Sequence, residues 1–318
     1  MPADAISYVA GGLFGIVAII GLFLNTTVLL AMYRGKMFTS KASPVYILSS
    51  QTILVDTLLL AVHLGYQCPS VMLQVRDCRL QTDLSIQATD NTHSSYCWYH
   101  NSLSHILVAV NRLFVIVFFR TNVFTRRRTI ALCILQHAAA LGLSITSQFL
   151  LPCCEFTYSW VVYSYQYNTK KGMRNYSNEY IDVPLNTSSS LIAIISYTMI
   201  IAKMRTARIQ TGNIEETSAA QLLHKEYRYA LQFATMATVY SLAWIFFRVF
   251  PILIGNTSEL YIYGVITVLA EMNMFTNSTV YLVNNKEIKK SLRAMRGIDN
   301  SISKMEITQS NVSTAVTT

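Results

Sequence analysis

The chain has 318 residues, of which 52% are hydrophobic and 13% are charged, and its formal net charge at pH 7 is +9. Soluble globular domains carry about 25% charged residues, so this composition excludes an ordinary soluble domain and indicates a membrane protein. Lys and Arg gather between the apolar runs, so the positive charge indicates membrane topology and no nucleic-acid partner is expected.

Apolar segments long enough to cross a bilayer recur along the sequence. A helix needs about 20 residues to cross roughly 30 Å of hydrocarbon. On this criterion the sequence predicts seven spans, at residues 6–33, 45–66, 84–119, 130–151, 182–203, 226–251 and 259–283. The stretch 81–95 is polar, so the third span faces a wet cavity, starts later, or is atypical of its family.

The last predicted span runs into a basic amphipathic segment, residues 285–296, which we expect to form an eighth helix where the chain meets the cytoplasm. The predicted fold is an all-α integral membrane protein, a seven-transmembrane helix bundle with an amphipathic eighth helix, in one receptor domain at 1–296. Residues 297–318 are polar and are expected to form a disordered cytoplasmic tail. Its hydroxyls are candidates for phosphorylation that recruits a partner, and a plain solvated terminus is the alternative.

The positions of Lys and Arg indicate orientation, because basic loops stay on the cytoplasmic side. Sequons at Asn175 and Asn256 fall in the predicted second and third outer loops, which agrees with an outer amino terminus. With that orientation, 18 of the 25 basic residues lie inside: Arg34, Lys36, Lys41, Arg120, Arg126, Arg127, Arg128, Lys203, Arg205, Arg208, Lys225, Arg228, Lys286, Lys289, Lys290, Arg293, Arg296 and Lys304.

Four of the six cysteines lie at or beyond the predicted outer membrane face, where oxidising conditions favour disulfides. We favour a bond from Cys78, in the first outer loop, to Cys153 or Cys154, in the second. A bond between Cys68 and Cys78 is the competing pairing, because the sequence alone does not decide connectivity.

Polar residues within predicted spans are candidates for function, because lipid offers them no partners. The deepest are Asn25, Asp56, Asn101, Asn273 and Asn277, and the last two lie one helical turn apart. A buried carboxylate must be neutralised, paired or given a cation, so Asp56 among amides suits a hydrated sodium ion or a water cluster. The alternative is that these groups only hold helices together through hydrogen bonds.

The cytoplasmic ends of the third and sixth predicted spans carry opposite charges. Asn111 and Arg112 close the third span, and Glu226 begins the sixth. An Arg facing a Glu there would form a latch that opens when the two helices separate, as a switch requires. The alternative is that each is an interfacial charge reaching toward water. Tyr281 shares a helix face with Asn277, so both point into the bundle.

Four residues are predicted at similar depth in the outer half of the bundle: Trp98, Trp244, Arg248 and Glu271. Trp98, for example, precedes Arg112 by 14 residues, or about 21 Å of helix. An apolar pocket with a few convergent polar groups is the usual form of a small-ligand site, so these four are the pocket candidates. The alternative is that Arg248 and Glu271 pair with each other as a structural contact.

No catalytic arrangement is found, and an enzyme is not expected. The sequence contains no HExxH, no Gly-rich phosphate loop and no cysteine pairs at zinc spacing, and its six histidines are scattered over different spans. A small membrane transporter or channel is the rival class, with Asp56, Arg248 and Glu271 lining a solute path. Only six prolines and no internal repeat are present, which disfavours it.

The seven spans, the Arg closing the third, the Tyr-x-x-Ala-Trp of the sixth and the Asn-x-x-x-Tyr before an amphipathic helix resemble the rhodopsin-like G-protein-coupled receptors. Within them, the chain is similar to the nematode serpentine chemoreceptors of class x, Srx. The similar stretches are Ile20-Gly21-Leu22-Phe23-Leu24-Asn25, Ser43 to Asp56, Ser104 to Arg112, Asn122-Val123-Phe124-Thr125 and Tyr180-Ile181-Asp182.

The resemblance implies that Arg112 is the hinge of G-protein engagement, Tyr281 the moving tyrosine and Trp244 the rotamer-sensitive aromatic. It also implies a buried polar network of Asn25, Asp56, Asn273 and Asn277. Asn111 stands where the superfamily usually has an acid, so basal signalling is expected to be raised. Phe246 and Ser278 replace prolines that would kink their helices. The usual cysteine of the third helix would fall near Gln87, so the standard outer disulfide is not implied.

The expected function is that of a chemosensory G-protein-coupled receptor, which converts binding of an external small molecule or peptide into activation of a heterotrimeric G protein. The basic second and third inner loops would face the G protein or anionic lipid. The expected partners are the lipid bilayer and an arrestin-like protein at the tail. The expected location is the plasma membrane, including sensory cilia. A receptor-like protein that has lost signalling is a further alternative.

Overall fold

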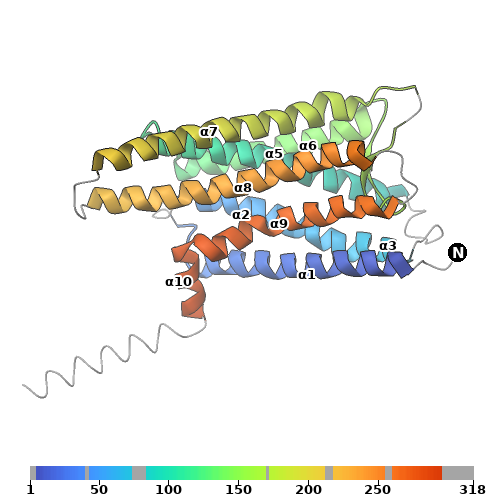
Figure 1. Ribbon diagram of the computed structural model, residues 1–318, viewed down its shortest axis with the longest axis horizontal. Helices are drawn as coiled ribbons and strands as arrows, with labels where there is room; N and C mark the ends of the chain where they lie inside the picture. The colour runs from blue at the N-terminus through green and yellow to red at the C-terminus, as the bar shows by residue number, and fades with distance from the viewer. Residues whose placement is uncertain are drawn as a thin grey trace, which may run out of the picture.

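The computed structural model describes residues 5–39, 43–73, 84–169, 172–211, 218–254 and 260–295. These residues form a bundle of seven long helical segments, which run side by side in Figure 1. The segments are α1 (Ala5–Arg34), α2 (Val45–Val62) continuing through η1 (His63–Gln67) into α3 (Cys68–Leu73), α5 (Leu84–Ile116), α6 (Arg126–Ile145) with η3 (Thr146–Leu150), η4 (Ser177–Asp182) with α7 (Val183–Thr211), α8 (Ser218–Ile254) and α9 (Gly264–Asn284).

Two short helices connect segments, η2 (Thr121–Phe124) before α6 and η5 (Leu260–Tyr263) before α9. After α9 the chain turns at Asn285 into α10 (Lys286–Met295), which crosses the end of the bundle in Figure 1. The side chain of Asn285 accepts hydrogen bonds from the backbone N–H groups of Glu287 and Ile288, which caps the new helix. Ile288 is fully buried against the bundle, so α10 is docked along its apolar face. The predicted all-α seven-helix fold with an amphipathic eighth helix is confirmed.

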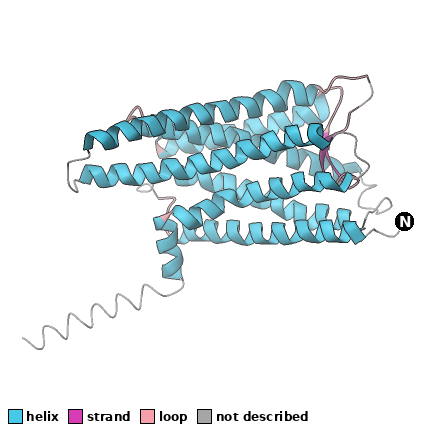
Figure 2. Ribbon diagram, viewed as in Figure 1, coloured by secondary structure: helices cyan, strands magenta, loops and turns pink. Residues whose placement is uncertain are grey.

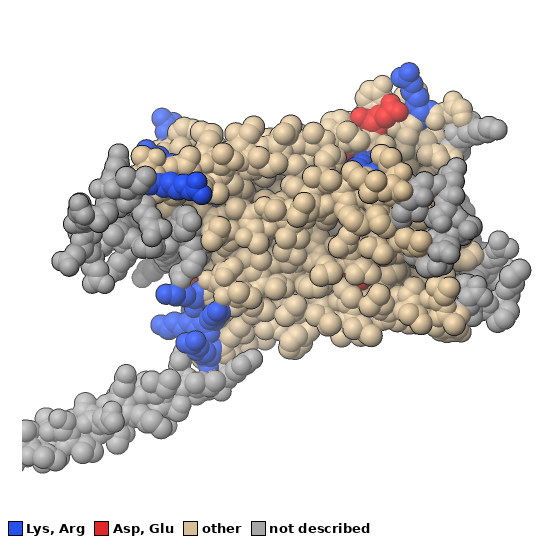
Figure 3. Space-filling model, viewed as in Figure 1, with Lys and Arg blue, Asp and Glu red and all other residues tan. Residues whose placement is uncertain are grey.

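The outside of the bundle is apolar and much of its polar content lies inside, as a lipid environment requires. By length and composition, five of the described segments can cross a membrane: Ala5–Arg34, Val45–Leu73, Arg126–Leu150, Ser177–Thr206 and Tyr229–Phe250. The other two, α5 and α9, carry more polar groups and bury them, with Asn101 7% and Glu271 0% exposed. Figure 3 shows a middle surface almost free of charge, with Lys and Arg gathered near α10.

The third helix begins at Leu84, which excludes the alternative of a later start. Its polar residues are covered by neighbouring helices: Asp90, Asn91 and Ser95 are all buried. Ser95 Oγ lies 2.7 Å from Ser144 Oγ on α6, which places this polar run against protein and not against lipid. Residues 81–83 of the run lie outside the described part of the chain.

Close packing of α1 against its neighbours depends on glycine. A Cβ atom added at Gly21 would lie 2.8 Å from side-chain carbons of both Leu60 on α2 and Phe275 on α9. Small residues let membrane helices approach closely in this way. The largest apolar core lies between this region and the α10 end, and it includes Val28, Ile53, Ile200, Met236 and Val280.

The opposite end of the bundle is closed by a β-hairpin, drawn as the strands of Figure 2. Strand β1 (Phe156–Ser159) pairs antiparallel with β2 (Ser164–Tyr167), with Phe156 opposite Tyr167. The hairpin turns its aromatic side chains into the bundle: Phe156 is 6% and Tyr158 is 9% exposed. Burial raises the pKa of the Tyr165 phenol well above its usual range, so Tyr165 remains a neutral hydroxyl group.

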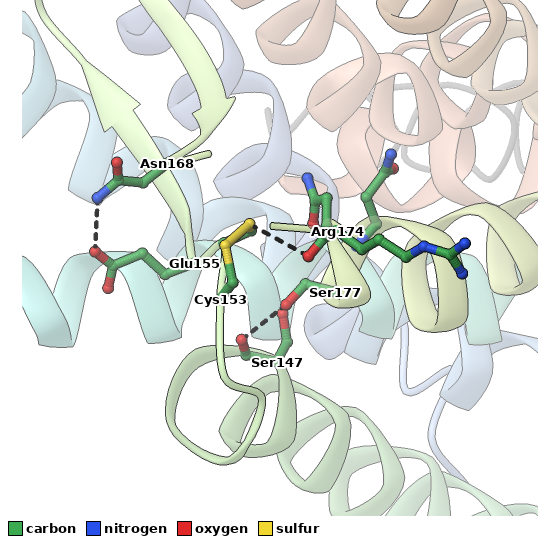
Figure 4. Close-up of a disulfide and its surroundings, with 9 residues drawn as sticks. Ser147, Cys153, Glu155, Asn168, Arg174 and Ser177 are labelled. Carbon is green, nitrogen blue, oxygen red and sulfur yellow. Dashed lines mark hydrogen bonds between the residues drawn. A yellow bond between two sulfur atoms is a disulfide. The ribbon is translucent and has the colours of Figure 1, made fainter. Parts of the chain in front are cut away.

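The prediction of a disulfide from Cys78 to Cys153 or Cys154 is wrong, because Cys153 and Cys154 are bonded to each other. The backbone of Cys154 has a positive φ of 79°, which folds the chain so that the adjacent side chains meet. Figure 4 shows this bond beside Arg174, whose carbonyl oxygen lies 3.7 Å from Cys154 Sγ. Cys68 is a buried free thiol, so the competing Cys68 to Cys78 bond is not formed either. Cys78 lies outside the described residues.

Hydrogen bonds hold the chain on both sides of this disulfide, as Figure 4 shows. Ser177 Oγ donates to the carbonyl oxygen of Ser147 at 3.0 Å, which ties the start of η4 to η3. Asn168 Nδ2 donates to Glu155 Oε1 at 3.2 Å, which ties the two ends of the hairpin together. The hairpin is therefore anchored at its base as well as through its buried aromatic residues.

Candidate functional site

A small cavity lies among α5, α8 and α9 beneath the hairpin, and we refer to it as the hairpin cavity. Its volume is about 40 Å³, which is room for water but not for an organic ligand. The lining is mostly aromatic and aliphatic, with a few polar groups, as in many small-ligand sites. The lining residues that matter below are Ser94, Trp98, Phe156, Tyr165, Phe247 and Asn273.

The hairpin fills the space that a larger ligand would need. Phe156 stacks on Tyr165 of the facing strand, with ring centroids 5.1 Å apart, and its ring lies 6.5 Å from that of Phe247. Phe247 in turn packs against Trp98 at 5.9 Å. These contacts join the hairpin directly to α5 and α8, so a movement of the hairpin and a change in the size of the cavity are coupled.

The predicted pocket residues Trp98 and Arg248 both contact Asp182, which the pocket prediction did not include. Trp98 Nε1 donates to Asp182 Oδ1 at 2.6 Å, and the guanidinium of Arg248 forms an ion pair with Asp182 Oδ2. Asn186 Nδ2 adds a further hydrogen bond to Asp182 Oδ1 at 2.6 Å. Asp182 therefore joins α5, α7 and α8 at the hairpin end of the bundle.

The alternative prediction that Arg248 pairs with Glu271 is wrong. Glu271 Oε1 lies 3.0 Å from His63 Nδ1 on η1, and both side chains are buried. His63 Nε2 lies 2.8 Å from the hydroxyl of Tyr165 on the hairpin. Gln67 donates to the same hydroxyl, and Ser94 Oγ lies 3.1 Å from it. Glu271 thus belongs to a polar cluster shared by α9, η1 and the hairpin.

The predicted polar network around Asp56 is partly assembled. Asn101 Nδ2 donates to Asp56 Oδ1 at 2.7 Å, and Asn277 Nδ2 lies 3.4 Å from Oδ2. Asn25 instead donates to the carbonyl oxygen of Met274 at 3.3 Å, and Asn273 lines the hairpin cavity. Amide groups from α5 and α9 therefore converge on one buried carboxylate of α2.

At the α10 end, Arg112 is 2% exposed and its guanidinium lies over two aromatic rings of α8. The centroid distances are 4.9 Å to Phe233 and 5.8 Å to Tyr229. Cation–π contacts of this kind stabilise by about 0.5–2 kcal/mol each, more when water is excluded. Glu226, the predicted partner, lies on α8, but its side chain is outside the described part of the structure. The described contacts hold α5 to α8 through aromatic rings.

Tyr281 extends this cluster toward α2. Its hydroxyl is hydrogen-bonded to Ser49, and its ring meets Phe233 edge to face at 6.2 Å. Beside it, the Tyr46 hydroxyl lies 3.2 Å from that of Tyr229 and donates to Glu287 of α10 at 2.5 Å. The ends of α2, α5, α8 and α9 are thereby linked to α10 by one continuous set of side chains.

The other predicted site residues lie apart from these clusters or beside them. Asn111 is buried beside Arg112, and Trp244 is half-buried with its Nε1 lacking a hydrogen-bond partner among the described residues. Asn175 is half-buried and accepts a hydrogen bond from the backbone of Asn178. Asn256 lies outside the described residues. Helices α8 and α9 are continuous through Phe246 and Ser278, the two positions where prolines were absent.

Sequence reasoning did not place Asp182, His63 or Tyr165 in a site. Asp182 could have been found from the sequence, because a single acid at the start of an apolar span needs a cationic partner. Arg248, in another predicted span, was a cation whose partner the sequence left open. His63 carried a weaker signal, as a lone histidine inside the predicted span 45–66. Tyr165 carried none, because its position depends on the turn of the hairpin.

The arrangement of seven helical segments and a crossing eighth helix is shared with a solved structure. The crystal structure of squid rhodopsin superimposes with a TM-score of 0.74, covering 92% of this chain and 80% of that one, at 16% sequence identity. At that identity the likeness shows the fold alone, which is that of a rhodopsin-like receptor. No curated protein sequence matches the chain.

The family is shown by sequence. Residues 16–287 match the family model described as the serpentine type 7TM GPCR chemoreceptor Srx, and this chain belongs to that family. It is therefore a multi-pass membrane protein of the seven-transmembrane chemoreceptor class and not an enzyme. The matched residues include those that line the hairpin cavity and Arg112 with the aromatic residues around it.

Proposed function

We propose that this receptor binds an external small molecule or peptide in the hairpin cavity and activates a heterotrimeric G protein at the α10 end. The hairpin end then faces outside together with the amino terminus, in the plasma membrane and its sensory cilia. The concentration of Lys and Arg at the α10 end supports this orientation, because basic segments stay in the cytoplasm.

The hairpin cavity supports ligand binding at the outer end. It lies where α5, α8 and α9 converge, it is lined by aromatic residues, and Tyr165 and Phe156 close it from outside. A ligand larger than a few waters enters only if the hairpin side chains move. Binding therefore favours a state in which the contacts of the hairpin with α5 and α8 are rearranged, and that differential affinity shifts the receptor's equilibrium.

The observation that carries the proposal is the burial of Arg112 over the rings of Tyr229 and Phe233. In this arrangement the cytoplasmic ends of α5 and α8 are held together, and Arg112 is covered. Separation of the two helices uncovers Arg112 and opens a surface for a G protein, a rigid-body transition of the kind that switches use. Asn111 stands beside Arg112 at the position where the wider superfamily usually has an acid, so a measurable basal signal is expected.

The test is basal G-protein activation in cells that express the full chain, normalised to receptor at the cell surface. We expect Arg112→Ala to abolish the signal. The matched control is Arg174→Ala, which removes an exposed arginine at the opposite, hairpin end of the bundle. If Arg112→Ala signals as the wild type does, the proposed coupling role of Arg112 is wrong.

Two further elements of the proposal concern sodium and the tail. The Oδ1 atoms of Asn25 and Asn101 have no hydrogen-bond partner among the described residues, and these oxygens with Asp56 fit the hard-oxygen donor set of a sodium ion. Sodium there would balance the buried carboxylate. The hydroxyl-rich tail, which lies outside the described residues, is the proposed contact for an arrestin-like protein after phosphorylation.

A further inference from the structure

The polar cluster beside the hairpin cavity has an excess of hydrogen-bond acceptors. We call it the acceptor cluster, made of His63, Gln67, Asp90, Tyr165 and Glu271. Three of its oxygen atoms are buried without a hydrogen-bond partner among the described residues: Glu271 Oε2, Asp90 Oδ1 and Gln67 Oε1. All three residues are at most 7% exposed. Buried acceptors without donors are strongly disfavoured, so the described part of the chain leaves this cluster short of a donor.

The charges of the cluster also indicate a missing partner, and that partner is a cation. It contains two carboxyl groups, Asp90 and Glu271, and one side chain able to carry a positive charge beside them, His63, which bonds to Glu271. Among the described residues at this end of the bundle, Arg248 is committed to Asp182 and Asn178. Asp90 lies beside Gln67, a neutral amide. A buried carboxylate needs a cationic partner, and the described chain supplies fewer cations here than carboxyl groups.

Tyr165 separates the acceptor cluster from the hairpin cavity and belongs to both. Its hydroxyl accepts a hydrogen bond from Gln67 and lies within hydrogen-bond distance of His63 and Ser94, while its ring lines the cavity. Glu271 also follows directly after Ala270, a lining residue of α9. When Tyr165 moves with the hairpin, Gln67 loses the acceptor of its hydrogen bond and the carboxyl groups become neighbours of the cavity.

The cavity itself is lined by an aromatic set suited to a cation. Trp98, Phe156, Tyr165 and Phe247 contribute rings from α5, both hairpin strands and α8. Cations bind the faces of such rings, and cages of aromatic residues are a common means of holding ammonium groups. The positive charge of an ammonium group also balances the carboxylate oxygens of the cluster, and a hydroxyl group carried beside it, as in choline, supplies an O–H donor.

We propose that the ligand of the hairpin cavity carries a positively charged amine, which the aromatic residues surround and which Glu271 and Asp90 neutralise once Tyr165 moves aside. This inference rests on the proposed function, since it names the chemistry of the ligand that the cavity accepts. Glu271 is the principal partner and His63 is a positioning residue, which orients the Glu271 carboxylate through Oε1 and leaves Oε2 for the ligand.

The test uses the purified full-length receptor and two probes of the same shape: choline, and its uncharged isostere in which carbon replaces the quaternary nitrogen. The midpoint of thermal unfolding is measured against probe concentration, because a ligand that binds only the folded state raises it. We expect choline to raise the midpoint and the isostere to leave it unchanged. Equal shifts from both probes, or no shift from choline, would overturn the inference.

Single substitutions show which side chains bind choline. We expect Glu271→Gln to weaken the apparent affinity for choline by about tenfold or more, since truncation of a buried charge partner has effects of that size. Glu155→Gln is the control, because it removes an exposed carboxylate of the hairpin base and is expected to change nothing. If Glu271→Gln does not fold, Asp90→Asn and Phe247→Leu carry the same test. Unchanged choline affinity in the variants that fold would refute the assignment.

The basal G-protein signal separates this inference from the proposed function. If choline does not bind while the basal signal persists and depends on Arg112, the cationic ligand is wrong and the receptor function stands. If the basal signal does not depend on Arg112 while choline binds through Glu271, the coupling role is wrong and the cation site stands. The two failures are therefore distinguishable in the same preparation.

Discussion

Replacement of Phe233 by leucine is expected to raise basal signalling. Phe233 is 3% exposed, its ring carries the guanidinium of Arg112 at 4.9 Å, and the same ring meets Tyr281 edge to face at 6.2 Å. Leucine preserves apolar burial but removes both ring interactions. The cation–π contact contributes about 0.5–2 kcal/mol, and the aromatic pair about 0.5–1.5 kcal/mol beyond its burial.

Both contacts belong to the arrangement in which Arg112 is covered. Their loss therefore destabilises that arrangement by about 1–3.5 kcal/mol relative to one in which α5 and α8 have separated. Since 1.4 kcal/mol is a tenfold change in an equilibrium constant, the open fraction is expected to rise between about fivefold and several hundredfold from a low basal level. The variant retains Arg112, the residue that we propose for coupling.

The assay is basal G-protein activation per receptor at the cell surface, with Phe246→Leu as the matched control. Phe246 also lies on α8 and stacks on an aromatic ring, that of Phe250 at 4.5 Å, but it does not contact Arg112. We expect an increase from Phe233→Leu and none from Phe246→Leu. A basal signal from Phe233→Leu equal to that of the wild type, or an equal increase from both variants, refutes the assignment of the closed state to the Arg112 stack.

Three other predictions concern the fold. Gly21→Val is expected to destabilise the receptor by about 1–3 kcal/mol, seen as a lower melting temperature, because its Cβ would lie 2.8 Å from side chains of two other helices. Arg248→Gln removes the ion-pair partner of Asp182 and is expected to lower the free energy of unfolding by about 3 kcal/mol. This is the low end for a buried pair, because the Arg248 side chain is 23% exposed. In the double variant with Asp182→Asn, thermal unfolding should show that part of this loss is recovered. Peptide mapping without reduction should recover Cys153 and Cys154 linked within one peptide, and a bond from either to another cysteine would contradict the structure.

The helices could be predicted because their signal is local. Each apolar run of about 20 residues must be a helix in lipid, whatever it packs against. The polar stretch of α5 was ambiguous for the same reason: Asp90 and Asn91 are tolerable in a helix only because neighbouring segments cover them. Covering is a property of the assembled bundle and is not visible in a window of sequence.

The partners within the candidate site were harder to predict, because depth along a helix does not fix rotation about its axis. Arg248 and Glu271 were correctly separated from lipid, but they face different neighbours, Asp182 and His63. The hairpin was not predicted, since its strands are only four residues each and lie in an outer loop. The adjacent-cysteine disulfide was not predicted either, because it depends on the local backbone turn at Cys154.

The central claim is that signalling separates the ends of α5 and α8 and uncovers Arg112. Its most direct test is the distance between spin labels at Phe118→Cys, two residues after the end of α5, and Leu231→Cys, on α8, both exposed positions. The distance is measured in the purified receptor with and without a nucleotide-free heterotrimeric G protein. We predict a longer distance when the G protein is bound, and a smaller change in Arg112→Ala. An unchanged distance in the complex would contradict the account.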